Sequence, residues 1–141
     1  TDYIDIENAN WITFMVNFGL MTSDSTDTMT ITVECSTAAS SNATEIEVPF
    51  KYRLSAAVGT DTPGTITASS SSDDWVSGSS DMASRLLIID VDPAEIPGIT
   101  GYDGHHYIRL WFNGSTNLGG PLSANIILEP AYAGNDMPDV T

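Results

Sequence analysis

The segment EIEVPFKYRL, residues 45–54, indicates the fold of this 141-residue chain. From Val48 onward, apolar side chains occupy every second position, and Pro49, Lys51 and Arg53 lie between them. A period of two residues is typical of a β-strand with one buried face. Because proline lacks an N–H, Pro49 predicts an edge strand or a bulge. We therefore expect one strand over 45–54, whose polar side carries Lys51 and Arg53 as candidate interface residues.

Similar alternation recurs along the chain. Residues 11–18 and 28–35 each place four apolar side chains on one side, and residues 106–113 also alternate. Residues 86–91 form a continuous apolar run, which predicts a central strand buried on both sides. Further strands are expected at 65–68 and 122–129. About seven to eight strands joined by polar turns predict an all-β fold, a single antiparallel β-sandwich of the jelly-roll or immunoglobulin-like kind.

Length and composition favour one domain. The 141 residues are 41% hydrophobic but only 16% charged, and Ser, Thr, Asn and Gly take the place of charge. We expect the sandwich to span residues 1–132 and a polar tail to follow at 133–141. The Ser-rich, acidic segment 69–84 predicts a mobile surface loop. Trp75, in the middle of that loop, is a candidate anchor that docks into its own domain or into a neighbour.

The charge is strongly negative. There are 19 acidic and 4 basic residues, which give a net charge of −15. Such a chain repels phosphate, so the sequence predicts no direct contact with nucleic acid or with anionic membranes. No apolar run approaches the about 18 residues that a membrane helix needs. The charge fits solubility, docking onto a basic partner surface, or life at high salt.

Residue types that carry chemistry are sparse. Cys35 is the one cysteine, so no intrachain disulfide is expected, and its place in an apolar alternation predicts a buried structural thiol. His105 and His106 are adjacent and would point to opposite faces of a strand, which disfavours a shared metal. No G-x-S-x-G elbow or Gly-rich phosphate loop is present. The sequence therefore predicts no enzyme activity, no cofactor and no metal centre.

Acidic pairs in the loops are candidates for a surface calcium site. Asp24, Asp27, Asp73 and Asp74 lie in oxygen-rich segments. The spaced Asp/Asn pattern of a calcium loop is absent, so solvated acids are the default interpretation.

One aromatic pair remains a candidate. Tyr107 and Trp111 fall on the same side of one predicted strand and flank Arg109. This side is consistent with core packing around an arginine that extends to solvent, with a subunit interface, or with a sugar-stacking platform. Tyr, Trp and Arg are the residue types that concentrate binding energy at interfaces.

Four segments together resemble a known family. They are Val48–Arg53 followed by Val58–Thr62, Leu87–Ile96, Tyr107–Leu110, and Ala124–Tyr132, which ends Glu-Pro-Ala-Tyr. In this order they are similar to a family of small structural proteins of tailed bacteriophages found with the capsid genes. The resemblance covers roughly residues 11–132. It departs from the family at Ala131, where a basic residue is expected, and in the acidic tail from residue 134.

The resemblance implies a structural role in a virion, and the family supplies no functional residues to carry over. It implies a non-enzymatic capsid decoration or cement protein on the outer capsid surface. Its partners would be the major capsid protein and neighbouring copies of itself, as a homo-oligomer for which the family suggests a trimer. A tail or head–tail connector component is an alternative within the virion. A carbohydrate-binding or adhesion module of a surface or fibre protein is an alternative of another class.

Overall fold

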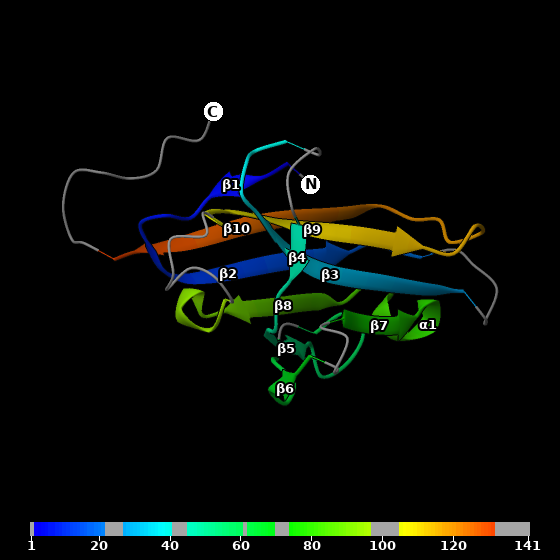
Figure 1. Ribbon diagram of the computed structural model, residues 1–141. Coiled ribbons are helices and arrows are strands. Elements are labelled where there is room, and N and C mark those ends of the chain that lie inside the picture. The colour runs from blue at the N-terminus through cyan, green and yellow to red at the C-terminus, as the bar shows by residue number, and fades with distance from the viewer. Residues whose placement is uncertain are drawn as a thin grey trace.

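The computed structural model describes residues 2–21, 27–40, 45–60, 62–69, 74–96 and 105–131. In these residues the chain forms two antiparallel five-stranded sheets around a shared apolar core (Figure 1). The all-β class and the antiparallel sandwich expected from the alternation are confirmed. The predicted tail at 133–141 lies outside the described residues.

The first sheet, here sheet A, has the strand order β1–β9–β3–β4, and β7 also pairs with β3. Because β9 pairs along nearly all of β3, strands β4 and β7 share the opposite edge of β3. Its strands are β1 (Ile4–Asp5), β3 (Thr28–Ser36), β4 (Glu45–Glu47), β7 (Asp74–Gly78) and β9 (Tyr107–Gly114).

The second sheet, sheet B, has the order β10–β2–β8–β5–β6. Its strands are β2 (Ala9–Phe18), β5 (Lys51–Leu54), β6 (Thr67–Ala68), β8 (Leu86–Val91) and β10 (Leu122–Pro130). A short helix, α1 (Ser79–Met82), follows β7, and a 3-10 turn, η1 (Pro93–Glu95), follows β8. The carboxylate of Asp92 accepts a hydrogen bond of 2.9 Å from the N–H of Ala94 and so caps the start of η1.

The core lies between the sheets and is lined by alternate residues of the long strands. The predicted inward sets of 11–18 and 28–35 are buried, and the inner faces of β2 and β8 in sheet B pack against those of β3 and β9 in sheet A. The buried residues of these strands are Ile12, Phe14, Val16, Phe18, Met29, Ile31, Val33, Cys35, Leu87, Ile89, Val91, Ile108 and Leu110. Two-residue periodicity therefore located the inner face correctly on the longest strands.

The segment 45–54 is not one strand, as the sequence predicted, but two strands in different sheets. After β4 in sheet A the chain crosses at Val48 and Phe50, both buried, and continues as β5 in sheet B. Val48 donates from its N–H to the carbonyl of Val33 at 3.0 Å, and Phe50 donates to Ser69 Oγ at 3.2 Å. Pro49 stands between them, where a missing N–H breaks no ladder. The alternation continued across the break because both sheets face the same core.

Two further expectations are corrected. The segment 69–84 was expected to be a mobile loop, but its described residues 74–82 form β7 and α1. The central strand β8 was expected to be buried on both sides, but only Leu87, Ile89 and Val91 are fully buried. Leu86 and Ile88 are half-buried and lie on the outer face of sheet B.

Candidate functional site

The six candidate interface residues do not come together. The outer face of sheet A carries Tyr107, Arg109 and Trp111, the outer face of sheet B carries Lys51 and Arg53, and the core holds Trp75. The two outer faces are on opposite sides of the sandwich. Any binding site must therefore use one group or the other.

Trp75 is a core residue, so it is not available as an interface residue. Its side chain is 4% exposed and stacks on Phe18, with the ring centroids 5.7 Å apart and the planes 18° from parallel. Trp75 lies in β7 opposite Ile31 of β3, so the alternation of sheet A directs it inward. Between the two alternatives given by the sequence, it docks into its own domain.

The side of β9 that carries Tyr107, Arg109 and Trp111 is the outer face, which excludes core packing for this group. Trp111 is 47% exposed, and Tyr107 is half-buried. The guanidinium carbon of Arg109 lies 4.8 Å from the ring centroid of Trp111 and 4.5 Å from that of Tyr3. Arginine is thus held between two aromatic rings at a distance typical of cation–π contacts.

Two carboxylates fix the other side of this arginine. Arg109 Nε donates to Glu34 Oε2 at 2.7 Å, and Arg109 Nη2 donates to Glu45 Oε1 at 2.9 Å. The side chains of Arg109 and Glu34 are only 12% and 14% exposed, so the closer pair is well shielded from water. We call these five residues, Tyr3, Glu34, Glu45, Arg109 and Trp111, the Arg109 cluster.

Strand register brings the cluster together. Glu34 of β3 lies directly opposite Arg109 of β9, and β4 holds Glu45 on the other side of β3. Tyr3 precedes β1, whose Ile4 pairs with Ile108, so Tyr3 comes next to Arg109. The sequence pattern indicated Arg109 and Trp111 as candidate interface residues, but it did not indicate Tyr3, Glu34 or Glu45. The available signal was that Glu34 falls on the predicted outward side of its strand.

The cluster shifts the proton affinities of its members. Desolvation works against the charge of Arg109, but the hydrogen bond and negative charge of Glu34 outweigh it and raise the pKa of the guanidinium. Desolvation, followed by its hydrogen bond to Glu45, raises the pKa of Tyr3 to about 12. The Tyr3 hydroxyl donates to the same Glu45 oxygen that Arg109 contacts. At neutral pH the cluster therefore contains a protonated tyrosine and a fixed arginine.

We expect one of the five tyrosines to titrate late, with the Tyr3 transition near pH 12. Since the folded-state pKa lies above the ordinary 10.0, this group stabilises the fold below pH 10, and its contribution is lost between pH 10 and 12. Ultraviolet absorbance of tyrosinate measures the titration, and circular dichroism monitors the fold. The variant Tyr3→Phe should lack the late component. Titration of all tyrosines near pH 10 in folded protein would contradict the hydrogen bond.

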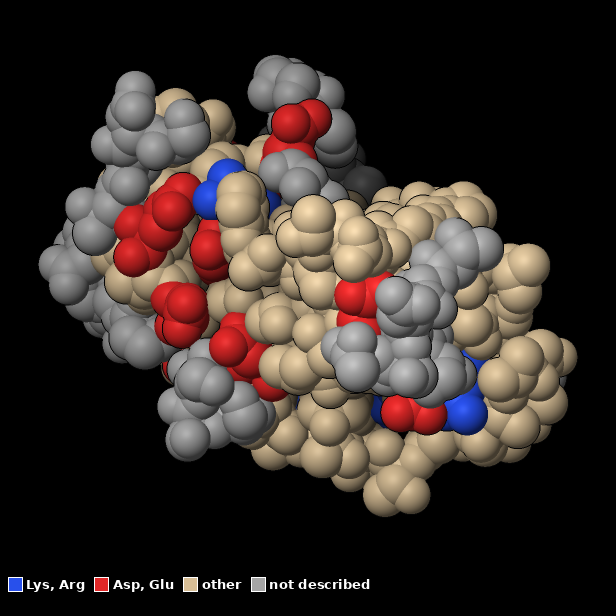
Figure 2. All heavy atoms as spheres, turned by 90° about the vertical axis from the view of Figure 1, so that its right-hand side faces the viewer, with Lys and Arg blue, Asp and Glu red and all other residues tan. Residues whose placement is uncertain are grey.

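The two basic residues on the outer face of sheet B, Lys51 and Arg53, have different surroundings from Arg109. Arg53 Nη2 donates to Asp90 Oδ2 at 3.0 Å, and Thr13 Oγ1 donates to Asp90 Oδ1 at 2.8 Å. Lys51 lies opposite Asp90 in the ladder and is exposed. In Figure 2 the visible basic side chains lie beside acidic ones, and acidic side chains form several separate groups. Lys51 and Arg53 thus both lie beside the carboxylate-bearing Asp90.

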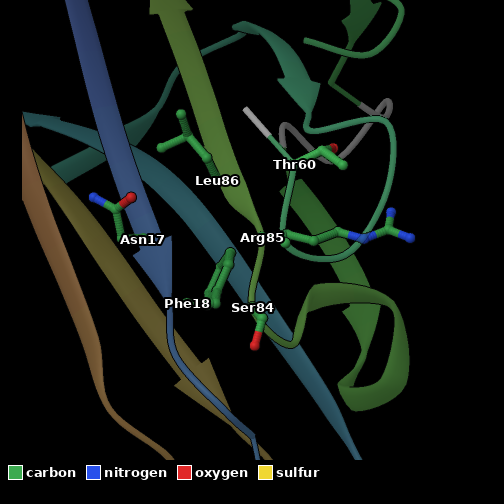
Figure 3. A pocket seen from close by; sticks show the side chains of 7 residues that line it. Asn17, Phe18, Thr60, Ser84, Arg85 and Leu86 are labelled. Atoms are coloured by element: carbon green, nitrogen blue, oxygen red, sulfur yellow. The ribbon is translucent and has the colours of Figure 1, made fainter. Parts of the chain in front are cut away.

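A shallow cavity of about 390 Å³ was not anticipated from the sequence. It is lined by Asn17, Phe18, Gly59, Thr60, Ser84, Arg85 and Leu86. Ser84, at φ 54°, is held by its N–H to the carbonyl of Gly19 and by its own carbonyl to the N–H of Gly59. In Figure 3 the guanidinium of Arg85 extends away from Asn17. The described lining includes no carboxylate, histidine or cysteine, so it offers no acid–base pair.

The remaining reactive groups lie apart from one another. Cys35 is fully buried, and burial raises the pKa of its thiol to about 12, as suits the structural role predicted for it. Asp27 accepts from Ser115 Oγ at 2.8 Å and Asp74 from Thr32 Oγ1 at 2.5 Å, whereas Asp24 and Asp73 lie outside the described residues. Within the described ranges, no three His, Cys, Asp or Glu side chains are grouped to hold a metal ion.

Comparison of the chain with protein-family models, with curated proteins and with solved structures finds no match. Among the helices that the structure describes, none is long and apolar enough to cross a membrane. Function is therefore inferred from the residues and surfaces of this chain. On that basis the Arg109 cluster is the best candidate site, because among the described residues it alone combines an exposed aromatic ring with a charge held by two ion pairs.

Proposed function

We propose that this chain is a non-enzymatic structural protein of a virion, which decorates or cements the outer capsid of a tailed phage. In this proposal the Arg109 cluster contacts the major capsid protein or a neighbouring copy. The single observation that carries it is the exposed Trp111 ring, stacked on an arginine that two carboxylates hold in place. The resemblance of the chain to small phage structural proteins supports the choice of partner.

The geometry of the cluster suits binding rather than catalysis. Arg109 contacts four side chains from three strands and the segment before β1, so little conformational freedom remains to be lost when a partner docks. Val76 of β7, 60% exposed, lies on the same outer face across β3. An exposed tryptophan beside a fixed arginine has the composition of an interface hot spot.

The overall charge favours a basic partner surface. With a net charge of −15, the chain is repelled by other acidic surfaces and drawn to basic ones. On the face shown in Figure 2, acidic side chains are more prominent than basic ones. Attraction of this kind speeds docking, whereas the buried aromatic contact would set how long the complex lasts.

Sedimentation of the native source material, with this chain followed by mass spectrometry, tests the proposal. We expect the chain to migrate with DNA-filled particles in a copy number comparable to that of the major capsid protein. A few copies per particle would replace the capsid role by a tail or connector role. Migration only as a free small protein would overturn the virion proposal.

The contact surface is tested by adding purified protein back to particles that lack it. We expect Trp111→Ala to weaken attachment by about tenfold or more, because an interface tryptophan contributes at hot-spot level. Ile66→Ala is the matched control, since Ile66 is 58% exposed and lies next to β6 in the other sheet. Equal attachment of both variants would exclude the Arg109 cluster as the contact.

Carbohydrate binding is a second candidate, favoured by the exposed face of the Trp111 ring beside carboxylate acceptors. Such a ring is a stacking surface for a sugar, and carboxylates accept hydrogen bonds from its hydroxyls. Loss of glycan binding in Trp111→Ala with particle association intact would favour this candidate. If the variant binds glycan as well as the parent does, the glycan-binding site does not include Trp111.

A further inference from the structure

One edge of sheet B is formed by a long strand, β10. Strand β10 is nine residues long and pairs with β2 from Leu122 opposite Phe18 to Pro130 opposite Ala9. Across the described part of the chain, no strand pairs with its other edge. The far edge of the same sheet is the two-residue β6, and the edges of sheet A are the two-residue β1 on one side and the three-residue β4 and five-residue β7 on the other. Short edge strands protect against pairing with other chains, and β10 lacks that protection.

Strand β10 also lacks the other usual protections of an edge. It contains no lysine, its one proline is the terminal Pro130, and its one irregularity falls between Glu129 and Pro130. Eight continuous ladder positions therefore precede the irregularity. Backbone N–H and C=O groups along such an edge alternate toward the open side, where another strand can pair with them.

The apolar side chains of β10 are incompletely covered. Ala124, Ile126 and Leu128 face the core, yet they are only half-buried, whereas their partners on β2 are 0–3% exposed. On the outer face Ile127 is 55% exposed. One more strand beside β10 would cover apolar surface on both faces of the sheet.

We propose that β10 pairs antiparallel with β10 of a second copy of this chain, which joins two B sheets into one continuous ten-stranded sheet. This inference is independent of the capsid proposal. Charge limits where two copies can meet and in which direction their strands can pair. Most contacts between two copies of a chain with net charge −15 would bring carboxylates together, but β10 carries one charged residue, Glu129, near its end.

Antiparallel pairing keeps those two carboxylates apart. If the two-fold axis passes near Ile126, each Glu129 lies opposite Ser123 of the second copy. The two Glu129 side chains are then separated by six residue positions, roughly 20 Å along the strand. Parallel pairing would place them side by side. The two-fold arrangement is closed and self-complementary, so it stops at a dimer. It differs from the trimer that the family resemblance suggested.

The pairing leaves the Arg109 cluster accessible. That cluster lies on the outer face of sheet A, whereas the proposed contact runs along the edge of sheet B. A dimer would therefore present two copies of the cluster to a larger partner, and simultaneous attachment of both would strengthen binding.

Sedimentation equilibrium of the full chain tests the pairing, with Ile127→Glu as the variant. Near the two-fold axis the two new carboxylates would lie diagonally across the ladder, about 7–8 Å apart. We expect a concentration-dependent dimer whose dissociation constant rises about tenfold or more in the variant. Ile66→Glu is the matched control, with the same change at a 58% exposed isoleucine away from β10, and should dimerise like the parent.

Hydrogen exchange identifies the strand. Amides of β10 should gain protection as the protein concentration rises, and Ile127→Glu should abolish the gain while circular dichroism shows an intact fold. A monomer at every concentration up to about 1 mM would overturn the proposal. So would an oligomer that Ile127→Glu leaves unchanged.

Discussion

Replacement of Trp75 by alanine is expected to lower the free energy of unfolding by about 3–5 kcal/mol. The indole is 4% exposed and stacks on Phe18, so the substitution removes a large buried surface and leaves a cavity between β7 and β2. Because β7 belongs to sheet A and β2 to sheet B, this stack also joins the two sheets across the core. Urea denaturation followed by circular dichroism measures the loss.

The control for Trp75 is the same change at Trp111. Trp111 is 47% exposed, and its removal costs one cation–π contact, so we expect a loss of about 1 kcal/mol or less. The pair of variants distinguishes a core tryptophan from a surface one with identical chemistry. Equal destabilisation by both substitutions would show that one of these placements is wrong.

Arg109→Met is expected to destabilise the fold by about 2–3 kcal/mol. Methionine preserves most of the apolar stem but leaves Glu34, only 14% exposed, without its 2.7 Å partner. Glu34 also lies opposite Glu47 on β4, so the loss of the arginine leaves like charges facing each other. The same denaturation experiment gives the loss of stability.

A second substitution separates the charge from the packing. Arg109→Met combined with Glu34→Gln should recover part of the stability, since the unpaired carboxylate is gone. Arg53→Met serves as the control, because its ion pair with Asp90 is 33% exposed on the arginine side and should contribute about 1 kcal/mol or less. No recovery in the double variant would mean that the ion pair with Glu34 is not what stabilises the cluster.

The long strands were predictable because each contributes alternate residues to one core. Ile12 and Ile31 fall on the inward side that period-two alternation assigns, and Ile89 falls within the apolar run of β8. For residues 106–113 the alternation was recognised, but the sequence left open which side faces the core. Alternation does not reveal which sheet a residue joins, so the change of sheet around Pro49 was missed. Strand β7 was missed because polar Ser and Asp residues surround its single large apolar side chain that points inward.

The candidate site was predictable only in part. The spacing of Tyr107, Arg109 and Trp111 placed them on one side of a strand, and the structure agrees. The partners of Arg109 depend on register between distant segments, since Glu34 is 75 positions away in the chain. The alternation of apolar residues also could not show that Lys51 and Arg53 lie on the outer face of sheet B, opposite the face that carries Arg109. That placement depends on which strands belong to which sheet.

The order of strands has a consequence for how this protein is made. Strand β2 begins at Ala9, but its partners β8 and β10 begin at Leu86 and Leu122. Early in synthesis, the N-terminal third therefore leaves the ribosome with an aggregation-prone strand that has nothing to pair with. Folding must close long loops late, which makes it slow and leaves time for association between nascent chains. During that interval, electrostatic repulsion between the acidic nascent chains opposes their aggregation.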